Sequence, residues 1–217
     1  LVGSEMCIRD RPCMDNDDFR RGRPSCHKQF GEATALLAAD ALVTAAFEVI
    51  ANAKLSAESR IEAVQLLSKG GGDRGMLYGQ ELDKRFETMR ASESELLELH
   101  AHKTGALIIA GVDLGCDAAQ ADDALRTALQ HYAAELGLVF QIVDDILDVT
   151  ATTEELGKPV GSDAENDKTT FITLYGLEGA RSLAKQHNDA ALTALADLGP
   201  EADFLREMAV ELLTRSK

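Results

Sequence analysis

The chain has 217 residues, of which 45% are hydrophobic and 27% are charged. This composition can bury the core of one domain, or of two small ones, and it excludes the disordered and fibrous classes. The 37 acidic residues outnumber the 22 basic ones, for a formal net charge of −15. Because such a surface repels phosphate groups, we expect neither a nucleic acid nor an anionic membrane as a partner.

Cysteine spacing and hydropathy narrow the class further. The four cysteines show no Cys-x-x-Cys spacing and no matching histidine pair, so the sequence predicts neither a zinc site nor a disulfide framework. No apolar run approaches the roughly 20 residues that span a bilayer, and the start lacks a basic segment followed by an apolar one. We therefore expect a soluble, cytoplasmic protein with reduced thiols.

The first eleven residues, LVGSEMCIRDR, match nothing downstream in pattern or composition. They read like a translated vector or sequencing linker, so we expect residues 1–11 not to be native and leave them out of the fold prediction. Residues 12–217 are expected to form one domain, because no repeat, low-complexity tract or linker divides them.

The segment CMDNDDFRRGRP, residues 13–24, places three aspartates directly before three arginines. Carboxylates can hold a Mg²⁺ that also binds phosphate oxygens, and arginine binds phosphate in a bidentate manner. The segment therefore suits a metal-bound diphosphate. The same order also suits a single helix with acids near its N-terminus and bases near its C-terminus, and the residues alone leave both interpretations open.

Alanine, leucine and glutamate dominate the rest of the chain, β-branched runs are short, and there are 4 prolines. This vocabulary predicts an all-α fold whose helices end at glycine or glycine-proline punctuation. The expected helices are residues 31–53, 56–69, about 79–89, 92–114, 119–150, 169–198 with a break near Gly176, and 201–215.

Two common enzyme motifs are excluded. The stretch GGGDRG formally fits a dinucleotide-binding loop, but a predicted helix precedes it where that loop requires a strand. The five histidines form no HExxH motif and no order of nucleophile, base and orienting residue, which argues against a hydrolase.

The stretch LHAHKTGALIIAG, residues 99–111, puts Lys103 and Thr104 inside an otherwise apolar helix. A lysine in this setting can extend its ammonium group to water along the helix surface. It can also reach an anion in a cavity. The residues alone do not decide between these interpretations.

The stretch LGLVFQIVDDILDVT, residues 136–150, carries three aspartates in one of the most apolar segments of the chain. At about 100° per residue, its apolar side chains cover an arc of roughly 200° on a helix, which predicts burial on most sides. Small residues lie upstream on the remaining narrow face, which could therefore line a cavity. That face carries Gln141, Asp144, Asp145 and Asp148, with Ala133, Ala134 and Gly137 upstream.

Asp144 and Asp148 are one helical turn apart and of like charge, and no lysine or arginine lies between Arg126 and Lys158. Where water is scarce, their repulsion needs a partner, and a divalent cation would turn it into binding. The other interpretation is the solvated stripe of an amphipathic helix. Lys158 and Lys168, in LGKPVGSDAENDKTTF, could reach an anion held by the aspartates through metal, or be ordinary surface lysines.

Taken together, the two acidic clusters resemble the trans-isoprenyl diphosphate synthase (polyprenyl synthetase) family, and within it the bacterial farnesyl diphosphate synthases. The resemblance runs from about Pro12 to the C-terminus. It rests on six stretches in family order: Asp15 with Arg20-Arg21-Gly22 and Pro24, CHKQFGEATALLAADAL, GQELD, HKTGALI, FQIVDDILD, and GKPVGSD with DKTTF.

The resemblance implies an all-α, single-domain helical bundle of the isoprenoid synthase type, incomplete at its N-terminus. In that family two aspartate motifs face each other and hold three Mg²⁺ ions around an allylic diphosphate. By resemblance, the metal ligands are Asp15, Asp144 and Asp148, supported by Asp145. The diphosphate-binding residues are Arg20, Lys103 and Lys168 for the allylic substrate, Lys158 closing over it, and Arg21 for isopentenyl diphosphate. Thr104 and Gln141 would direct dipoles to the carbocation, so that the catalytic set is Lys103, Thr104, Gln141 and Lys158.

The implied activity is a Mg-dependent prenyltransferase that condenses isopentenyl diphosphate with dimethylallyl or geranyl diphosphate to farnesyl diphosphate. Ionisation gives an allylic carbocation, so no side-chain nucleophile is needed. The family also implies a homodimer, with residues 31–53 as a candidate surface. The alternatives are a geranylgeranyl diphosphate synthase, a terpene cyclase, which would not need Arg21, and a noncatalytic helical partner subunit of a synthase.

The chain departs from the family pattern at its start. Where the first motif reads Asp-Asp-x-x-x-x-Asp, this chain has Arg9, Asp10 and Asp15. The family's earlier helices, which carry basic residues for isopentenyl diphosphate and set product length, have no counterpart. We therefore expect this polypeptide to be inactive or weakly active.

Overall fold

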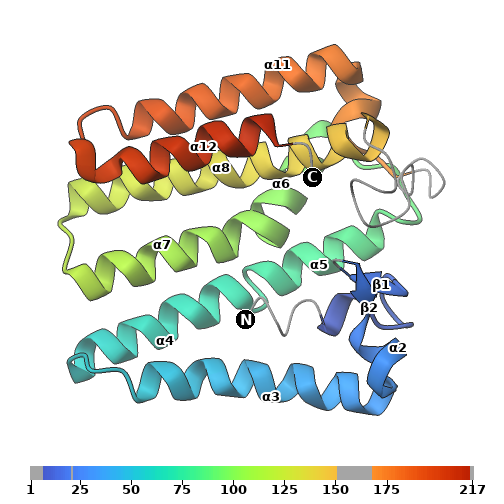
Figure 1. Cartoon of the computed structure of the whole chain (residues 1–217), viewed down its shortest axis with the longest axis horizontal. Coiled ribbons are helices and arrows are strands. Elements are labelled where there is room, and N and C mark those ends of the chain that lie inside the picture. Colours follow the sequence, from blue (N-terminus) through green and yellow to red (C-terminus); the bar gives the residue numbers. More distant parts are fainter. Residues whose placement is uncertain (1–6, 21, 151–167, 216–217) are drawn as a thin grey trace. The chain divides into compact units, whose positions relative to one another are not determined.

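A computed structural model describes residues 7–20, 22–150 and 168–215 of the chain (Figure 1). These residues divide into two compact units, one within residues 7–64 and the other comprising residues 65–150 and 168–215. Helix α4 (Ala57–Gly71) runs across the boundary in sequence.

The first unit begins with a helical turn at residues 7–9 and continues with a short hairpin that the sequence did not predict. Strands β1 (Phe19–Arg20) and β2 (Arg23–Pro24) pair antiparallel, with Arg20 opposite Arg23. Helices α2 (Cys26–Phe30) and α3 (Glu32–Ala51) follow, separated by Gly31 at φ 88°. That left-handed value favours glycine and separates the two helices. The predicted helix 31–53 is α3, and α2 is an additional helix that the sequence did not predict.

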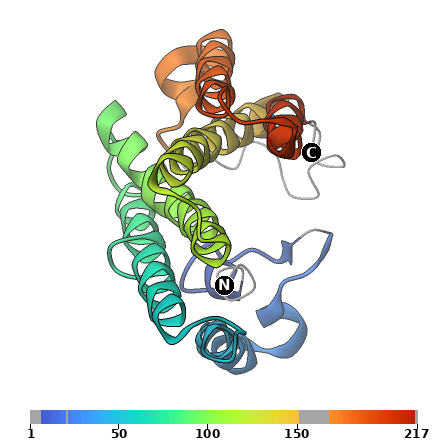
Figure 2. The ribbon, with the colours of Figure 1, turned by 90° about the vertical axis from the view of Figure 1, so that its left-hand side faces the viewer.

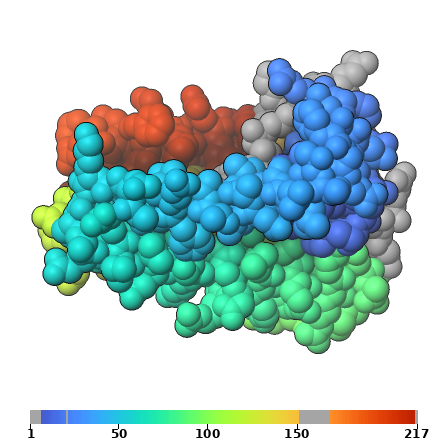
Figure 3. Space-filling model, turned by 90° about the horizontal axis from the view of Figure 1, so that it is seen from below, coloured from blue at the N-terminus to red at the C-terminus, as the bar shows by residue number. Residues whose placement is uncertain are grey.

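Helix α3 is the exposed apolar element of this unit, and it lies on the surface in Figure 3. Its side chains at Leu37 and Val49 are 66% and 71% exposed. By length and composition alone, this helix of 20 residues could cross a membrane, although a core helix or a signal sequence passes the same test. The prediction that no apolar run approaches this length was therefore wrong for α3, because its few acidic residues are widely spaced. The cytoplasmic location stays a prediction.

The second unit is a helical bundle around one long helix. Helix α8 (Asp123–Thr150) contacts the helices before it and after it, and Figures 1 and 2 show α11 and α12 against it. Its other elements are α5 (Met76–Arg85), α6 (Glu93–His100), the π-helix η1 (Ala101–Gly105), α7 (Ala106–Ala119), α11 (Phe171–Ala194), the 3-10 turn η2 (Pro200–Ala202) and α12 (Asp203–Thr214).

The sequence predicted most of these helices but not their interruptions. The expected helix 92–114 is α6, η1 and α7 in direct succession, and it continues past Gly115 to a left-handed cap at Gln120, φ 51°. Gly115 lies inside α7 and has no positive φ, so this glycine does not end the helix. The predicted break at Gly176 is confirmed by its φ of 68° inside α11.

The core at one end of α8 joins it to α11 and α12. Its fully buried members are Tyr132, Leu136, Ala191, Leu195 and Ala209. The Tyr132 hydroxyl donates a hydrogen bond of 2.8 Å to the carbonyl of Leu205. The turn between α11 and α12 is fastened by the Arg206 guanidinium, which donates to the carbonyls of Leu195, Leu198 and Gly199.

Removing the Tyr132 hydroxyl is expected to lower the free energy of unfolding by about 1 to 2 kcal/mol, because a buried hydrogen bond is lost. Burial raises the pKa of Tyr132 to about 12. The unfolded chain therefore ionises first, and wild-type stability should fall as the pH rises from 10 to 12. Urea unfolding of Tyr132→Phe should show a smaller fall than wild type, whereas Tyr175→Phe, at a residue that is 37% exposed, should change stability at pH 7 by less than about 0.5 kcal/mol. Equal losses in the two variants would contradict this account.

Candidate functional site

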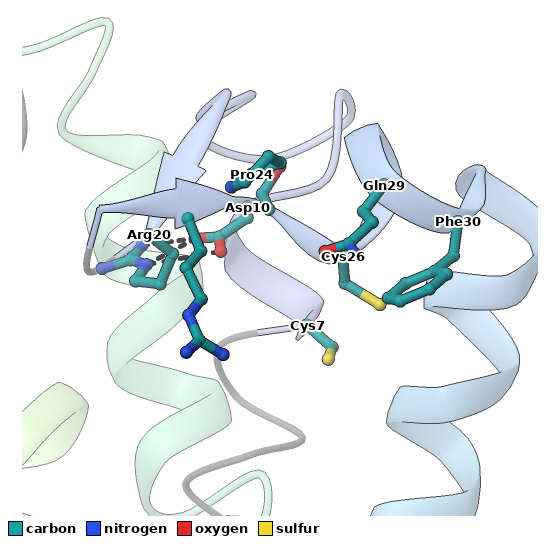
Figure 4. A pocket seen from close by; sticks show the side chains of 9 residues that line it. Cys7, Asp10, Arg20, Pro24, Cys26, Gln29 and Phe30 are labelled. Carbon is teal, nitrogen blue, oxygen red and sulfur yellow. Dashed lines mark hydrogen bonds and ion pairs between the residues drawn. The ribbon is translucent and has the colours of Figure 1, made fainter.

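In the first unit, the predicted diphosphate ligand Arg20 forms an ion pair within the protein. Its Nε donates to both carboxylate oxygens of Asp10, at 3.0 and 3.3 Å, and its Nη2 contacts Asp10 and, at 3.3 Å, Asp17. Asp10 is 3% exposed, and its hydrogen bonds raise the pKa of Arg20. Figure 4 shows this pair at the wall of a cavity of about 410 Å³ between the N-terminal segment, the hairpin and α2.

The remaining predicted residues of the first cluster are only partly described. The predicted metal ligand Asp15 accepts a 3.3 Å hydrogen bond from Arg9 Nε, and its backbone N–H donates to the Arg9 carbonyl at 2.8 Å. Arg9, which stands where the family has a principal aspartate, is thus a counter-ion of Asp15. Arg21 and Lys158 lie outside the described residues.

In the second unit, the polar face of α8 is not a uniformly solvated stripe. The Asp144 side chain is 40% exposed, whereas Asp145 and Asp148 are 9% and 4% exposed. Asp145 Oδ2 accepts a 2.7 Å hydrogen bond from the backbone N–H of Phe171. This bond connects the first turn of α11 to α8. Asp145 therefore stabilises the packing of these two helices.

Asp144 is paired with a residue from the end of the chain. Arg215 Nη2 donates to Asp144 Oδ1 at 2.7 Å and to the Phe140 carbonyl at 3.1 Å. The guanidinium carbon lies 4.3 Å from the centroid of the Phe140 ring, a cation–π contact. The basic partner that the local sequence lacks is therefore supplied from 71 residues away.

The predicted residues Lys103 and Thr104 lie on the π-helix η1, an element often found at functional sites. Two glycines let other helices approach its backbone. A Cβ at Gly79 on α5 would lie 2.1 Å from the backbone N of Lys103, and a Cβ at Gly137 on α8 would lie 3.2 Å from Gly105 Cα. The small residue at 137 thus allows close packing, where the sequence suggested a cavity.

The Lys103 ammonium group does not extend into water but forms an ion pair with a carboxylate of α5. Its Nζ lies 2.7 Å from Asp83 Oδ2 of α5, and the two side chains are 13% and 12% exposed. Lys168 precedes α11 in the sequence, and its Nζ lies 3.9 Å from Oε1 of Glu87. The Thr169 hydroxyl beside it accepts from the N–H of Ala91 at 3.1 Å, which holds this segment near the start of α6.

Gln141 joins η1 to α8. Its Oε1 accepts a 3.0 Å hydrogen bond from the Thr104 hydroxyl and lies 3.0 Å from His100 Nδ1. The His100 ring stacks on Phe171 at 5.3 Å between centroids. Burial, assisted by the charge of Lys103, lowers the pKa of His100 to about 4, so the ring is neutral at pH 7.

The neutral state of His100 predicts an acid-sensitive stability. Because its pKa falls from the ordinary 6.5 to about 4 on folding, the unfolded chain takes up the proton first. The contribution is complete above pH 6.5 and is lost as the pH falls to 4, by about 3 kcal/mol. The charged groups that act on the ring are Lys103, Asp83 and Asp144. Unfolding curves of wild type and His100→Asn should therefore converge between pH 6.5 and 4, and parallel curves would contradict this.

The carboxylates of α8 suit a magnesium ion shared with a substrate. Among residues 7–20, 22–150 and 168–215, no group of three or more histidine, cysteine or acidic side chains could hold a metal. Magnesium is commonly bound through one or two carboxylates together with substrate phosphates and water. Asp144 and Asp148, one turn apart on α8, supply that number of oxygen ligands, so the donor set fits.

Three residues at this site were not singled out by the sequence analysis. Asp83 appeared only as part of GQELD, His100 only among the five histidines that form no catalytic motif, and Arg215 not at all. Each acts through a partner distant in sequence, and such partners are visible only after folding.

Comparison with known proteins gives the family. The model of the polyprenyl synthetase family matches residues 13–200. The farnesyl diphosphate synthase of Micrococcus luteus is 43% identical over 208 residues, 96% of this chain and 72% of that protein. A chloroplastic geranylgeranyl pyrophosphate synthase of Catharanthus roseus is 45% identical over 195 residues, 88% of this chain and 55% of that protein.

Solved structures agree with this likeness. A geranyltransferase from Helicobacter pylori, complexed with magnesium and isoprenyl diphosphate, has a TM-score of 0.85 and 39% identity, over 97% of this chain and 69% of that one. An FPP/GFPP synthase from Zymomonas mobilis has a TM-score of 0.85 and 37% identity, over 96% and 71%. The predicted all-α fold and the predicted likeness to bacterial farnesyl diphosphate synthases are confirmed, and the chain belongs to the polyprenyl synthetase family.

Proposed function

We propose that this chain is a magnesium-dependent prenyltransferase that joins isopentenyl diphosphate to dimethylallyl or geranyl diphosphate, with farnesyl diphosphate as the product. The observation that carries the proposal is the Thr104–Gln141 hydrogen bond, which joins the lysine-bearing π-helix to the aspartate-bearing helix α8. Lys103 and Asp144 both act electrostatically on the His100 ring beside that bond. These contacts support the proposal that Lys103, as a diphosphate ligand, and Asp144, as a metal ligand, act at the same site.

The residues divide the chemistry between binding and stabilisation. Asp144 and Asp148, with Asp15 from the first motif, would hold Mg²⁺, which when bound neutralises the charge of the departing diphosphate. Lys103 and Lys168 would bind the allylic diphosphate, as would Arg20 after release from Asp10. Lys158 is proposed to close over it, and Arg21 to bind isopentenyl diphosphate. Asp145 binds the backbone N–H of Phe171 and so fixes the start of α11, which follows shortly after Lys168 in the sequence.

The reaction needs no nucleophilic side chain. The allylic C–O bond breaks with its electron pair going to the diphosphate, and the isopentenyl double bond attacks the resulting cation. A proton then leaves the new chain to the released diphosphate. Thr104 and Gln141 contribute oriented dipoles next to the positive carbon, a form of electrostatic stabilisation.

The test is isothermal titration of the chain with a non-hydrolysable allylic diphosphate analogue, with and without Mg²⁺. We expect binding that requires Mg²⁺ and weakens about 100-fold in Asp144→Asn, because a metal ligand is lost. The matched control is Asp123→Asn, an exposed aspartate at the other end of α8, which should bind as wild type does.

Binding without Mg²⁺ dependence, or equal binding by the two variants, would sink the proposal. Either result would favour the alternative of a noncatalytic partner subunit, for which no binding of a metal-bound diphosphate is expected. Because Arg9 pairs with Asp15 and occupies a carboxylate that is proposed to bind metal, we expect slow turnover.

A geranylgeranyl diphosphate synthase is the second candidate, favoured by the 45% identity to the Catharanthus roseus protein. The two candidates share the same site residues and differ in product length. Chromatography of the products formed from geranyl and from farnesyl diphosphate separates them. The homodimer stays a proposal, for which sedimentation of the chain is the direct measurement.

A further inference from the structure

The hydrogen bond between Thr104 and Gln141 can have either of two polarities, and they differ in what they present to a substrate. In one, the Thr104 hydroxyl donates to the amide oxygen and keeps its lone pairs for other neighbours. In the other, the amide is rotated and its N–H donates to the hydroxyl oxygen, which leaves the hydroxyl proton free to turn outward. A lone pair stabilises a neighbouring carbocation, and a hydroxyl proton destabilises it.

His100 approaches the same amide atom and is therefore linked to this choice. Thr104 Oγ1 and His100 Nδ1 each lie 3.0 Å from Gln141 Oε1. An amide oxygen has two lone pairs, which two donors can fill, so this polarity requires the neutral ring to carry its proton on Nδ1. The rotated amide would donate to both groups and would require the ring proton on Nε2.

The environment of His100 Nε2 favours the first arrangement. This atom is buried and has no hydrogen-bond partner among the residues that the structure describes. A buried N–H without a partner is rarer in proteins than a buried acceptor without one. The proton is therefore better placed on Nδ1, where Gln141 accepts it.

The ring is also held in place from its other side. His100 ends α6 directly before the π-helix, and its ring stacks on Phe171 at an interplanar angle of 25°. The Phe171 N–H is bonded in turn to Asp145 of α8. The ring is 9% exposed and cannot turn without disturbing these contacts.

We propose that His100 is a positioning residue: by donating from Nδ1 to Gln141 Oε1, it fixes the amide so that Thr104 presents oxygen lone pairs to the reacting allylic carbon. The role in catalysis rests on the proposed function. The polarity of the hydrogen bonds rests on the geometry alone. The catalytic role and the hydrogen-bond polarity can therefore be tested separately.

The polarity is measured by ¹⁵N NMR of the histidine rings of the full chain at pH 7, with His100 assigned by its absence in His100→Asn. The expected result is the tautomer with the proton on Nδ1, the minor form of free histidine. It should revert toward the Nε2 form in Gln141→Leu, which removes the acceptor. A proton on Nε2 in wild type would overturn the proposal, whether or not the chain makes any product.

The catalytic consequence is measured by single-turnover formation of the prenyl product. His100→Leu should slow the step about 10- to 100-fold, because the amide loses its fixed orientation. His100→Asn should restore most of that loss, since its side-chain N–H can donate from nearly the position of Nδ1. Magnesium-dependent binding of the diphosphate analogue should stay within about threefold of wild type in both variants.

Three outcomes would contradict the proposal. They are an unchanged rate in His100→Leu, equal rates in the leucine and asparagine variants, and parallel loss of analogue binding and rate, which marks a merely structural role. If wild type neither binds the analogue nor forms product, the proposed function fails, and the tautomer measurement still decides the hydrogen-bond polarity.

Discussion

Replacing Gly79 by alanine is expected to destabilise the second unit by about 3 kcal/mol or more, at the upper end of the cost of overpacking. The added Cβ would lie 2.1 Å from the N and 2.4 Å from the Cα of Lys103, and 2.7 Å from the carbonyl carbon of His102. These are backbone atoms, so no side-chain rotation can make room. The π-helix must move away from α5, and Lys103 and Thr104 move with it. Urea unfolding followed by circular dichroism measures the loss.

The matched control is Gly111→Ala on α7, where an added Cβ meets no atom within 4 Å. There alanine should be neutral or stabilising by up to about 1 kcal/mol, because glycine is the poorer helix former. Gly79→Ala should also weaken magnesium-dependent binding of the diphosphate analogue, and Gly111→Ala should not. Equal stability of the two variants would show that α5 is not in contact with the π-helix.

The Asp83–Lys103 ion pair supports the second large prediction. Its two side chains are about seven-eighths buried and 2.7 Å apart. Removing one partner leaves the other charge in a site poor in water, which costs about 3 kcal/mol or more in comparable buried pairs. Asp83→Leu is therefore expected to lower the free energy of unfolding by about that amount.

A double-mutant cycle separates the pair from its surroundings. Adding Lys103→Met to Asp83→Leu should recover much of the lost stability, since no uncompensated charge remains. It should not recover binding of the diphosphate analogue, because the proposed ligand Lys103 is gone. The exposed pair of Lys185 and Asp189 on α11 is the control, and its cycle should give less than about 1 kcal/mol. Additive effects of Asp83→Leu and Lys103→Met would contradict the pairing.

Structural features that depend on residues close together in the sequence could be predicted, and features that depend on contacts between distant residues could not. Helix α8 and the break at Gly176 were predictable, because helical periodicity and glycine conformation are local properties. The π-helix was not predicted, and the close approach of α5 and α8 to residues 101–105 at Gly79 and Gly137 is a tertiary contact that the local sequence does not show.

The same distinction holds for the candidate site, where the site residues could be picked out from the sequence but their ion-pair partners could not. The residues alone left the roles of Lys103 and Asp144 open, and the family resemblance implied a diphosphate and a metal for them and oriented dipoles for Thr104 and Gln141. Their partners did not follow from the sequence, because Asp83 and Arg215 reach them from other helices. A charge pattern along one helix gives the chemistry that is needed, and only packing shows which counter-charges are present.

In the proposed enzyme, the contact of Arg215 with Asp144 would compete with the metal ion that Asp144 is proposed to bind. A guanidinium and a dication on the same carboxylate oxygen repel each other, so at Oδ1 they exclude one another. By reciprocity, whatever free energy holds Arg215 on Asp144 in the free protein is subtracted from metal binding there, and each bound ion loosens the end of α12 by the same amount. The Asp144 side chain is 40% exposed, so this competition weakens as salt concentration rises. Ionic strength would then act on the proposed enzyme in two opposite directions, by screening the metal and by releasing its competitor.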